Sequence, residues 1–289
     1  MTLFNADDYG VTAAQTEHIL DCRKHGCLTG VSAMPNSPYL PEAMSAIADD
    51  PGLRVAVHLN LTEGLCLSDP ADIPLLAQAD GRFYPSFLRL FLLSLGPKRA
   101  ALLAEMQREL TAQIERVLPL LGGRPLRLDG HQHIQMIPAV TRAVRDAVAA
   151  NGWTVSYMRW TREPLSPYLR HLSLWRDYRP VNVVKNLVLN VLSLFGARYI
   201  KQMGLPRNLA MGLVISGNLE YRLVRELLPD FERLAAKRGV DLELVMHPGW
   251  GIGPGEGLDV PGGMFEAFGL DPGRMREYEC LLKLNNDTL

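Results

Sequence analysis

Short apolar runs alternate with longer amphipathic segments along almost the whole chain. The short runs resemble buried β-strands, and the longer segments carry apolar residues at three- and four-residue spacing, as helices packed on a core do. This alternation predicts an α/β fold in which crossover helices connect parallel strands. The predicted strands are Thr2–Asn5, Leu28–Met34, Arg54–Asn60, Pro125–Asp129, Trp153–Arg159, Met211–Ser216 and Asp241–His247. The clearest predicted helices are Ala13–Lys24, Lys98–Leu120, Ala139–Ala150 and Glu220–Arg238.

Polar side chains able to do chemistry follow these strands at their carboxyl ends. They are Asp7, Asp8, His58, Asp129, His131, Arg159 and His247. In a closed or nearly closed parallel barrel, the loops after the strands form one face, where residues distant in sequence converge. An open doubly wound sheet would spread them along a crevice, and no glycine-rich phosphate fingerprint follows the first strand. We therefore expect one domain over residues 1–289, a distorted TIM-type (β/α) barrel of seven strands.

Two apolar insertions, near 84–97 and 165–207, interrupt the alternation. Their most apolar parts, Ser86–Leu95 and Val181–Phe195, are shorter than a bilayer span. In the second part a narrow polar stripe leaves a broad apolar helix face. That stripe consists of Asn182, Lys185, Asn186, Asn190 and Ser193.

The surroundings of the second insertion are basic. Between 168 and 207 lie seven Lys or Arg residues and one acid, Asp177. An apolar helix in a basic neighbourhood suits an anionic membrane surface or a lipid-bearing substrate. Packing on the barrel or in a homodimer explains the apolar face equally well, and both interpretations stay open here.

Composition narrows the partners and the compartment. A net charge of −1 over 289 residues argues against nucleic acid, which attracts an excess of basic residues. The four cysteines show neither the spacing of a zinc knuckle nor a disulfide framework, which favours a reducing compartment. The chain starts almost directly with the Asp-Asp segment, leaving no room for a secretory signal. We expect a cytoplasmic protein, with peripheral attachment to the inner face of the membrane as the alternative.

The strand-end residues suit a metal-dependent hydrolase. A carboxylate and two imidazoles, from Asp8, His58 and His131, suit zinc and tolerate harder ions such as magnesium, with positions left for water and substrate. His131 and His133 alternate along an extended loop, so only one of them is expected to reach the metal. A bound ion acidifies its water and polarises a carbonyl, which allows attack on an amide or ester.

Two further residues complete this hypothesis. Asp7 lies beside the ligand carboxylate and is placed to take the proton from the attacking water, and His247 could protonate the leaving amine. Asp129 is expected to orient a ligand histidine through its second nitrogen. Arg159 is expected to clamp substrate or to pair with Asp7, and an ion pair with Glu163 is the structural alternative.

Ordinary structural roles compete with each assignment. A lone Asp after a strand more often caps a helix or closes a turn, and this alternative holds for Asp129 as well. His58, following Val-Ala-Val, could be a hydrogen-bonded core histidine. The Asp7–Asp8 doublet followed by Tyr-Gly favours the functional interpretation.

Four motifs in order make the chain resemble the YdjC-like (ChbG/HpnK) carbohydrate deacetylase family over nearly its full length. They are Asn5-Ala6-Asp7-Asp8-Tyr9-Gly10, His58-Leu59-Asn60-Leu61-Thr62, Asp129-Gly130-His131-Gln132-His133 and His247-Pro248-Gly249. Tyr9 stands where Phe is usual, and the third motif is Asp-Gly-His-Gln-His where some members have Asp-Ser-His-His-His. Neither departure removes a ligand.

The resemblance implies a barrel related to the polysaccharide deacetylases, a divalent metal, and removal of an acetyl group from an N-acetylated sugar. By position it implies that Asp8, His58 and His131 are the ligands, with His131 selected over His133. It also implies that Asp7 is the base and that His247 is a catalytic or substrate-contacting histidine. The expected substrate is an N-acetylhexosamine in a carbohydrate or in a glycolipid, and the apolar insertions are the feature that suggests a lipid-linked sugar.

Two other functions compete with a deacetylase. A non-catalytic carbohydrate-binding barrel would need no spare base, so the presence of Asp7 argues against it. A metal phosphoesterase usually holds a second ion with more carboxylates than the third motif supplies.

Overall fold

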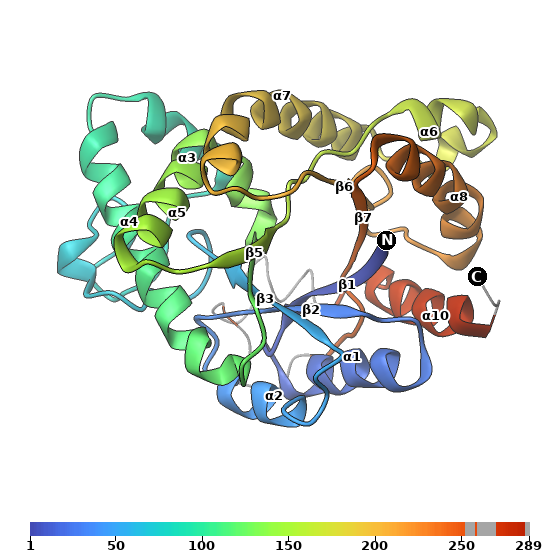
Figure 1. Cartoon of the computed structure of the whole chain (residues 1–289), viewed down its shortest axis with the longest axis horizontal. Coiled ribbons are helices and arrows are strands. Elements are labelled where there is room, and N and C mark those ends of the chain that lie inside the picture. The colour runs from blue at the N-terminus through green and yellow to red at the C-terminus, as the bar shows by residue number, and fades with distance from the viewer. Residues whose placement is uncertain (252–257, 259–269, 287–289) are drawn as a thin grey trace.

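Seven parallel strands form one curled sheet with helices around it (Figure 1). This computed structural model describes residues 1–251, 258 and 270–286. The order of the strands across the sheet is β5-β4-β3-β2-β1-β7-β6. The strands are β1 (Thr2–Tyr9), β2 (Gly30–Ala33), β3 (Arg54–Leu59), β4 (Leu126–Gly130), β5 (Val155–Met158), β6 (Asn208–Met211) and β7 (Asp241–Met246). The predicted α/β fold with seven strands in a curled, barrel-like sheet is confirmed.

Helices cover the outside of this sheet. They are α1 (Ala13–His25), α2 (Leu40–Ala46), α3 (Phe87–Leu95), α4 (Arg99–Val117), α5 (Pro138–Asn151), α6 (Ser166–Arg170), α7 (Pro180–Gln202), α8 (Tyr221–Arg238) and α10 (Gly273–Asn286). Short 3₁₀ helices occupy Pro70–Asp72, Leu118–Leu121, His131–Met136 and Leu172–Asp177. On α4, for example, Leu102, Met106 and Leu110 are buried at four-residue spacing. Burying this apolar stripe of α4 removes it from water, which stabilises the barrel.

A single amide side chain joins the two ends of the sheet. Asn208, at the start of β6, accepts a hydrogen bond from the Trp160 backbone N–H at 2.8 Å and donates one to the Met158 carbonyl at 2.9 Å. One backbone bond follows, from the Ala210 N–H to the Arg162 carbonyl at 3.0 Å. The buried backbone groups facing this gap are thereby satisfied without a regular strand ladder.

Six strand predictions and the four helix predictions match the structure to within a few residues, whereas the prediction for β6 is wrong. The strand is Asn208–Met211 rather than Met211–Ser216. The apolar run after Met211 looks like a strand, but a side chain binds its backbone. The buried Glu163 carboxylate accepts from the N–H groups of Gly212, Leu213 and Val214 at 2.5, 3.0 and 3.1 Å. These donors therefore need no partner strand.

Glu163 holds more than this loop. Its carboxylate also accepts from the Tyr168 hydroxyl at 2.7 Å and from the Asn186 amide of α7 at 2.6 Å. Burial raises the pKa of the Glu163 carboxyl, and these donors oppose that effect. One carboxylate therefore ties the segment after β5, the loop after β6 and helix α7 together.

Replacing Glu163 by Ala should lower the free energy of unfolding by about 3 kcal/mol or more, because several buried donors lose their acceptor. Urea unfolding followed by circular dichroism measures this change. Glu115→Ala, at an exposed position of α4, is the control and should change stability by less than about 0.5 kcal/mol. A loss below about 1 kcal/mol for Glu163→Ala would contradict the role assigned to this carboxylate.

Candidate active site

A bulge in β1 turns two neighbouring carboxylates to the same side of the sheet. The pairing with β2 joins Ala6 to Val31 and then Tyr9 to Ala33, so β1 carries one extra residue between these points. Asp8 takes up the irregularity with a left-handed φ of 61°, which is costly for a residue other than glycine and is typical of functional sites. Adjacent side chains of a regular strand would face opposite sides.

Asp8, His58 and His131 come together from β1, β3 and the loop after β4. The Asp8 Oδ1 lies 2.9 Å from the His131 Nδ1 and 3.4 Å from the His58 Nε2. The three ligand atoms lie within 4.8 Å of one another, and all three side chains are buried. These distances and this donor set fit a single divalent cation bound by one carboxylate and two imidazoles.

A carboxylate holds the second nitrogen of each imidazole. His58 Nδ1 lies 2.7 Å from Asp129 Oδ1, and His131 Nε2 lies 2.8 Å from Glu63 Oε2. Glu63 also accepts from the Gln132 amide at 2.6 Å. Partners of this kind fix the ring orientation and the tautomer of a metal-binding histidine. The site therefore has the outer contacts that a metal centre requires as well as the ligands.

The same carboxylates shift the protonation of the imidazoles. Burial disfavours the charged form of His58, but Asp129 and Asp7 outweigh it and raise its pKa to about 9. Burial likewise opposes charge on His131, where Asp8 and Glu63 raise the pKa to about 10. Burial alone would raise the pKa of Asp8, but both imidazoles hold it well below its usual range.

Arg159 is buried at the centre of a group of acids. Its guanidinium donates to both oxygens of Asp7 at 2.7 Å each. It also lies 2.9 Å from Asp129 and 2.8 Å from Glu243. Its exposed fraction is 0%, so the side chain is not positioned to clamp substrate. It pairs with Asp7, whereas the Glu163 carboxylate is bound by the donors described above.

Arg159 also lowers the pKa of the Asp7 carboxyl. Burial would raise the pKa of this carboxyl, but Arg159 and then His58 lower it below the ordinary value. Asp7 is therefore ionised at neutral pH and able to accept a proton. Its Oδ2 lies 3.9 Å from the His58 Nε2 and 4.0 Å from the His247 Nε2.

His247 follows β7 and is held in place by α10. Its backbone N–H donates to Glu277 at 2.5 Å, and its carbonyl accepts from Arg274 at 3.0 Å. Its side chain is 17% exposed, more than those of Asp7 and His58. The imidazole therefore lies between Asp7 and the more accessible side of the site.

His133 lies beside the cluster without belonging to the group of three ligands. Its backbone is left-handed with a φ of 59°, and its Nδ1 lies 3.3 Å from the Thr161 hydroxyl. Burial, followed by the charge of Arg159, lowers its pKa to about 3. His133 is therefore a neutral imidazole at neutral pH, suited to hydrogen bonding.

A second group of possible ligands, Asp7, His58 and Asp129, lies next to the first. Arg159 already binds both of its carboxylates, so a cation placed there would face a buried positive charge. The Arg159 ion pairs go to Asp7, Asp129 and Glu243 and not to Asp8, so the group of Asp8, His58 and His131 is the better cation site.

Sequence patterns did not single out four charged residues of this site: Glu63, Glu243, Arg274 and Glu277. Glu63 directly follows the second motif, which ends at Thr62, and this position is the signal that could have pointed to it. Arg274 and Glu277 belong to α10, a helix that the hydrophobic period did not reveal.

The curled α/β barrel and its Asp-His cluster define a barrel protein with a candidate metal centre. The chain belongs to the YdjC-like protein family, whose model matches residues 2–284.

Two relatives by sequence and one solved structure are similar to this chain. The chain is 27% identical to a carbohydrate deacetylase of Danio rerio, over 87% of this chain and 82% of that protein. It is 30% identical to a chitooligosaccharide deacetylase of Enterobacter sp. (strain 638), over 53% of this chain and 57% of that protein. A crystal structure from Enterococcus faecalis V583, provisionally described as a cellobiose-phosphate cleavage protein, shares the fold with a TM-score of 0.68. It has 20% identity and covers 99% of this chain and 92% of its own.

The Glu277 carboxyl predicts a pH dependence of stability. Burial raises its pKa from 4.5 to about 7, so the folded protein keeps a proton that the unfolded chain releases in this interval. The contribution of Glu277 to stability therefore falls as the pH rises from about 4.5 to about 7. Between pH 5 and pH 6.5, Glu277→Gln should reduce this pH-dependent loss by about 1 to 2 kcal/mol.

Urea unfolding of the metal-free protein at several pH values measures this difference. The control is Glu279→Gln on the same helix, where the side chain is half exposed. An unchanged pH slope in Glu277→Gln would show that this carboxyl does not hold the proton.

Proposed function

We propose that this protein is a metal-dependent hydrolase that removes the acetyl group from an N-acetylhexosamine-containing carbohydrate. The main support is the buried group of Asp8, His58 and His131 with the ionised Asp7 beside it. The names of the two deacetylase relatives support the carbohydrate substrate. Because neither name states a metal, the metal requirement rests on the geometry alone.

Asp8, His58 and His131 would hold one divalent ion, with zinc or magnesium as the best fits to the donor set. When bound, such an ion acidifies a water and polarises the amide carbonyl. Asp129 and Glu63 keep the two imidazoles turned toward the ion. Residues of this chain therefore both bind the ion and orient the side chains that bind it.

Asp7 is the proposed base. It is charged, it lies beside the ligands without being needed as one, and Arg159 fixes both of its oxygens. It takes a proton from the water as the water oxygen bonds to the acetyl carbon. The carbon–nitrogen bond then breaks, and the sugar nitrogen needs a proton to leave as an amine.

His247 is the proposed proton donor for that amine. Its Nε2 lies 4.0 Å from the Asp7 Oδ2, and its side chain is more accessible than Asp7. His247 gives its proton to the amine, and the proton that Asp7 took from the water then passes to His247 and restores it. The products are acetate and a free amino sugar.

Asp7→Asn should lower the rate of acetate release at least a hundredfold, because the amide of Asn cannot accept the proton. Metal analysis of the same preparation should show unchanged metal content. Asp8→Ala and His131→Ala should lose both activity and metal. Full turnover by metal-loaded Asp7→Asn on a confirmed substrate would show that another group is the base.

Glu63→Gln should weaken metal binding about 10- to 100-fold, because the charge that orients His131 is removed. Competition with a chelator measures the affinity. Glu105→Gln is the matched control: Glu105 is also a buried glutamate, and it accepts from the Leu75 N–H at 2.7 Å, outside the site. Equal affinities for both variants and the unaltered protein would contradict the orienting role.

The finer proposal is that the sugar is carried on a lipid and that the reaction takes place in the cytoplasm, at the inner face of the membrane. The apolar helices α3 and α7 support the lipid, and the four free cysteines support a reducing compartment. An acetate-release screen of soluble and lipid-linked N-acetylated sugars with several divalent ions tests both levels. Acetate release from soluble sugars alone would contradict the lipid-linked substrate and would still agree with the deacetylase proposal.

A further inference from the structure

Helix α7 leaves most of its large apolar residues at the surface and buries three amides or hydroxyls of its polar stripe. Asn182, Asn186 and Ser193 are buried, together with the apolar residues Leu189, Leu192 and Ile200. Its exposed large apolar residues are Val181, Val184, Leu187, Val188, Val191, Leu194 and Phe195. A usual surface helix turns its apolar face toward the core instead.

Hydrogen bonds fix α7 in this orientation. Asn186 donates to the Glu163 carboxylate at 2.6 Å, and Asn190 donates to the Glu163 carbonyl at 2.9 Å. Asn182 donates to the Ser216 carbonyl at 3.0 Å. Rotating the helix to bury its apolar face would break these bonds and leave Glu163 without two of its donors. The outward apolar face is therefore built into the fold.

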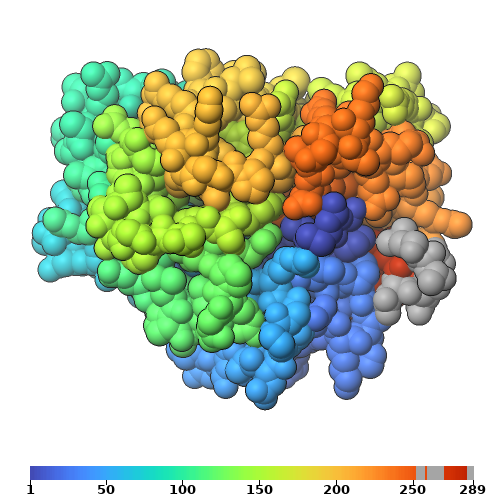
Figure 2. Space-filling view, viewed as in Figure 1, coloured from blue at the N-terminus to red at the C-terminus, as the bar shows by residue number. Residues whose placement is uncertain are grey.

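Neighbouring segments extend this face. Leu169, Leu172 and Trp175, in and after α6, are each more than 60% exposed. In the one viewing direction of Figures 1 and 2, α3, α6 and α7 all lie toward the upper edge of the molecule. We call the exposed apolar residues of these segments the apolar edge.

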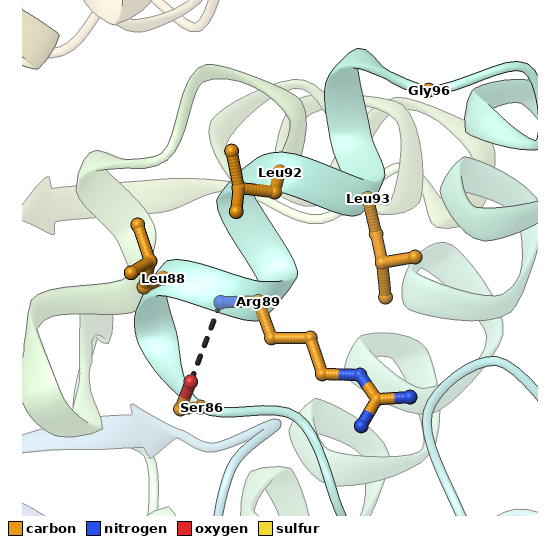
Figure 3. A pocket seen from close by; sticks show the side chains of 6 residues that line it. All are labelled: Ser86, Leu88, Arg89, Leu92, Leu93 and Gly96. Atoms are coloured by element: carbon orange, nitrogen blue, oxygen red, sulfur yellow. Dashed lines mark hydrogen bonds between the residues drawn. The ribbon is translucent and has the colours of Figure 1, made fainter.

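Helix α3 adds its own leucines and a shallow hollow to the apolar edge. Leu88, Leu92 and Leu95 are exposed. The hollow, of about 370 Å³, is lined mainly by leucines and by the chain of Arg89 (Figure 3). A hollow with apolar walls and one cation suits an acyl chain next to an anionic headgroup.

The segments that carry the apolar edge are rich in basic residues. Residues 81–104 and 165–207 together contain eleven Lys or Arg and one acid, Asp177, which pairs with Arg222 at 3.1 Å. Arg82 and Arg170 pair with Asp80 and Asp230, which lie outside these ranges. The whole chain, by contrast, has a net charge of −1. The segments with the exposed apolar side chains are therefore more basic than the chain as a whole, even with these two pairs taken into account.

We propose that the apolar edge docks on an anionic lipid bilayer, with α7 lying along the membrane surface. Apolar side chains enter the boundary between headgroups and acyl chains, and the surrounding Lys and Arg residues meet anionic headgroups. This inference does not rest on the proposed deacetylase activity, because membrane binding needs no substrate.

The charge pattern favours a membrane over a second copy of the chain. A symmetric dimer would place the apolar edge against itself and bring its basic residues near one another.

The hydrogen bonds of α7 argue against a helix that spans the membrane. The whole helix has 23 residues and is long and apolar enough to cross a bilayer. The expectation from the sequence rested only on its most apolar part, Val181–Phe195, which is too short to span. The polar face of the whole helix is nevertheless bound to the barrel.

Vesicle flotation of the full chain tests the proposal. Vesicles of phosphatidylcholine with phosphatidylglycerol should bind the protein, and pure phosphatidylcholine vesicles should bind it much less. The double variant Leu187→Glu/Val191→Glu should reduce binding to the anionic vesicles about tenfold or more, because two anchors become anions. Leu270→Glu is the matched control, since Leu270 is also exposed but lies outside the apolar edge.

Two further measurements separate folding and self-association from docking. Circular dichroism and acetate release from a soluble substrate should be unchanged in the double variant. Absence of binding to anionic vesicles by the unaltered protein would overturn the proposal. So would a dimer in sedimentation velocity that the double variant abolishes, because the apolar edge would then be an interface between copies.

Discussion

The charge balance around Arg159 is the interaction on which the rest of the site depends. Asp7, Asp129 and Glu243 all contact this one buried guanidinium. Buried carboxylates without a partner would become protonated, because ionised groups are costly to remove from water. Arg159 therefore keeps Asp7 charged beside the candidate ligands, and it also contacts Asp129, the carboxylate that holds His58. Three strands, β1, β4 and β7, are linked through the same side chain, so catalytic geometry and barrel packing share one contact.

The sequence predicted where the functional side chains would gather, because carboxyl ends of parallel strands meet at one face of a barrel. It did not predict how Asp7 and Asp8 come to face the same way. Alternation along a strand separates neighbours, and only the bulge at Asp8 reverses that rule. Of the two acids that hold the imidazoles, one could be predicted from the sequence and the other could not. Asp129 lies next to a predicted strand end, whereas Glu63 lies in a loop whose path no periodic pattern describes.

Helix α7 and strand β6 show why the remaining errors arose. The polar stripe of α7 was recognised, but periodicity alone does not say which side of a helix faces the protein. The side was decided by Glu163, a buried acid distant from the stripe in sequence. The same carboxylate binds the N–H groups after β6 and ends that strand early. Helix α10 escaped prediction because its weak apolar period gives little signal, although it positions His247.

Asn208 lies where the two edge strands of the sheet, β5 and β6, meet without a regular strand ladder. Elsewhere adjacent strands are joined by several backbone bonds, but β5 and β6 meet mainly through one amide. The chain between these two strands contains α6 and α7, so a long crossover connects the two strands of the weakest joint. Insertions, deletions or substitutions in that crossover would not disturb any strand ladder. The Asp-His cluster lies on other strand ends, so such a change in the crossover would leave it in place.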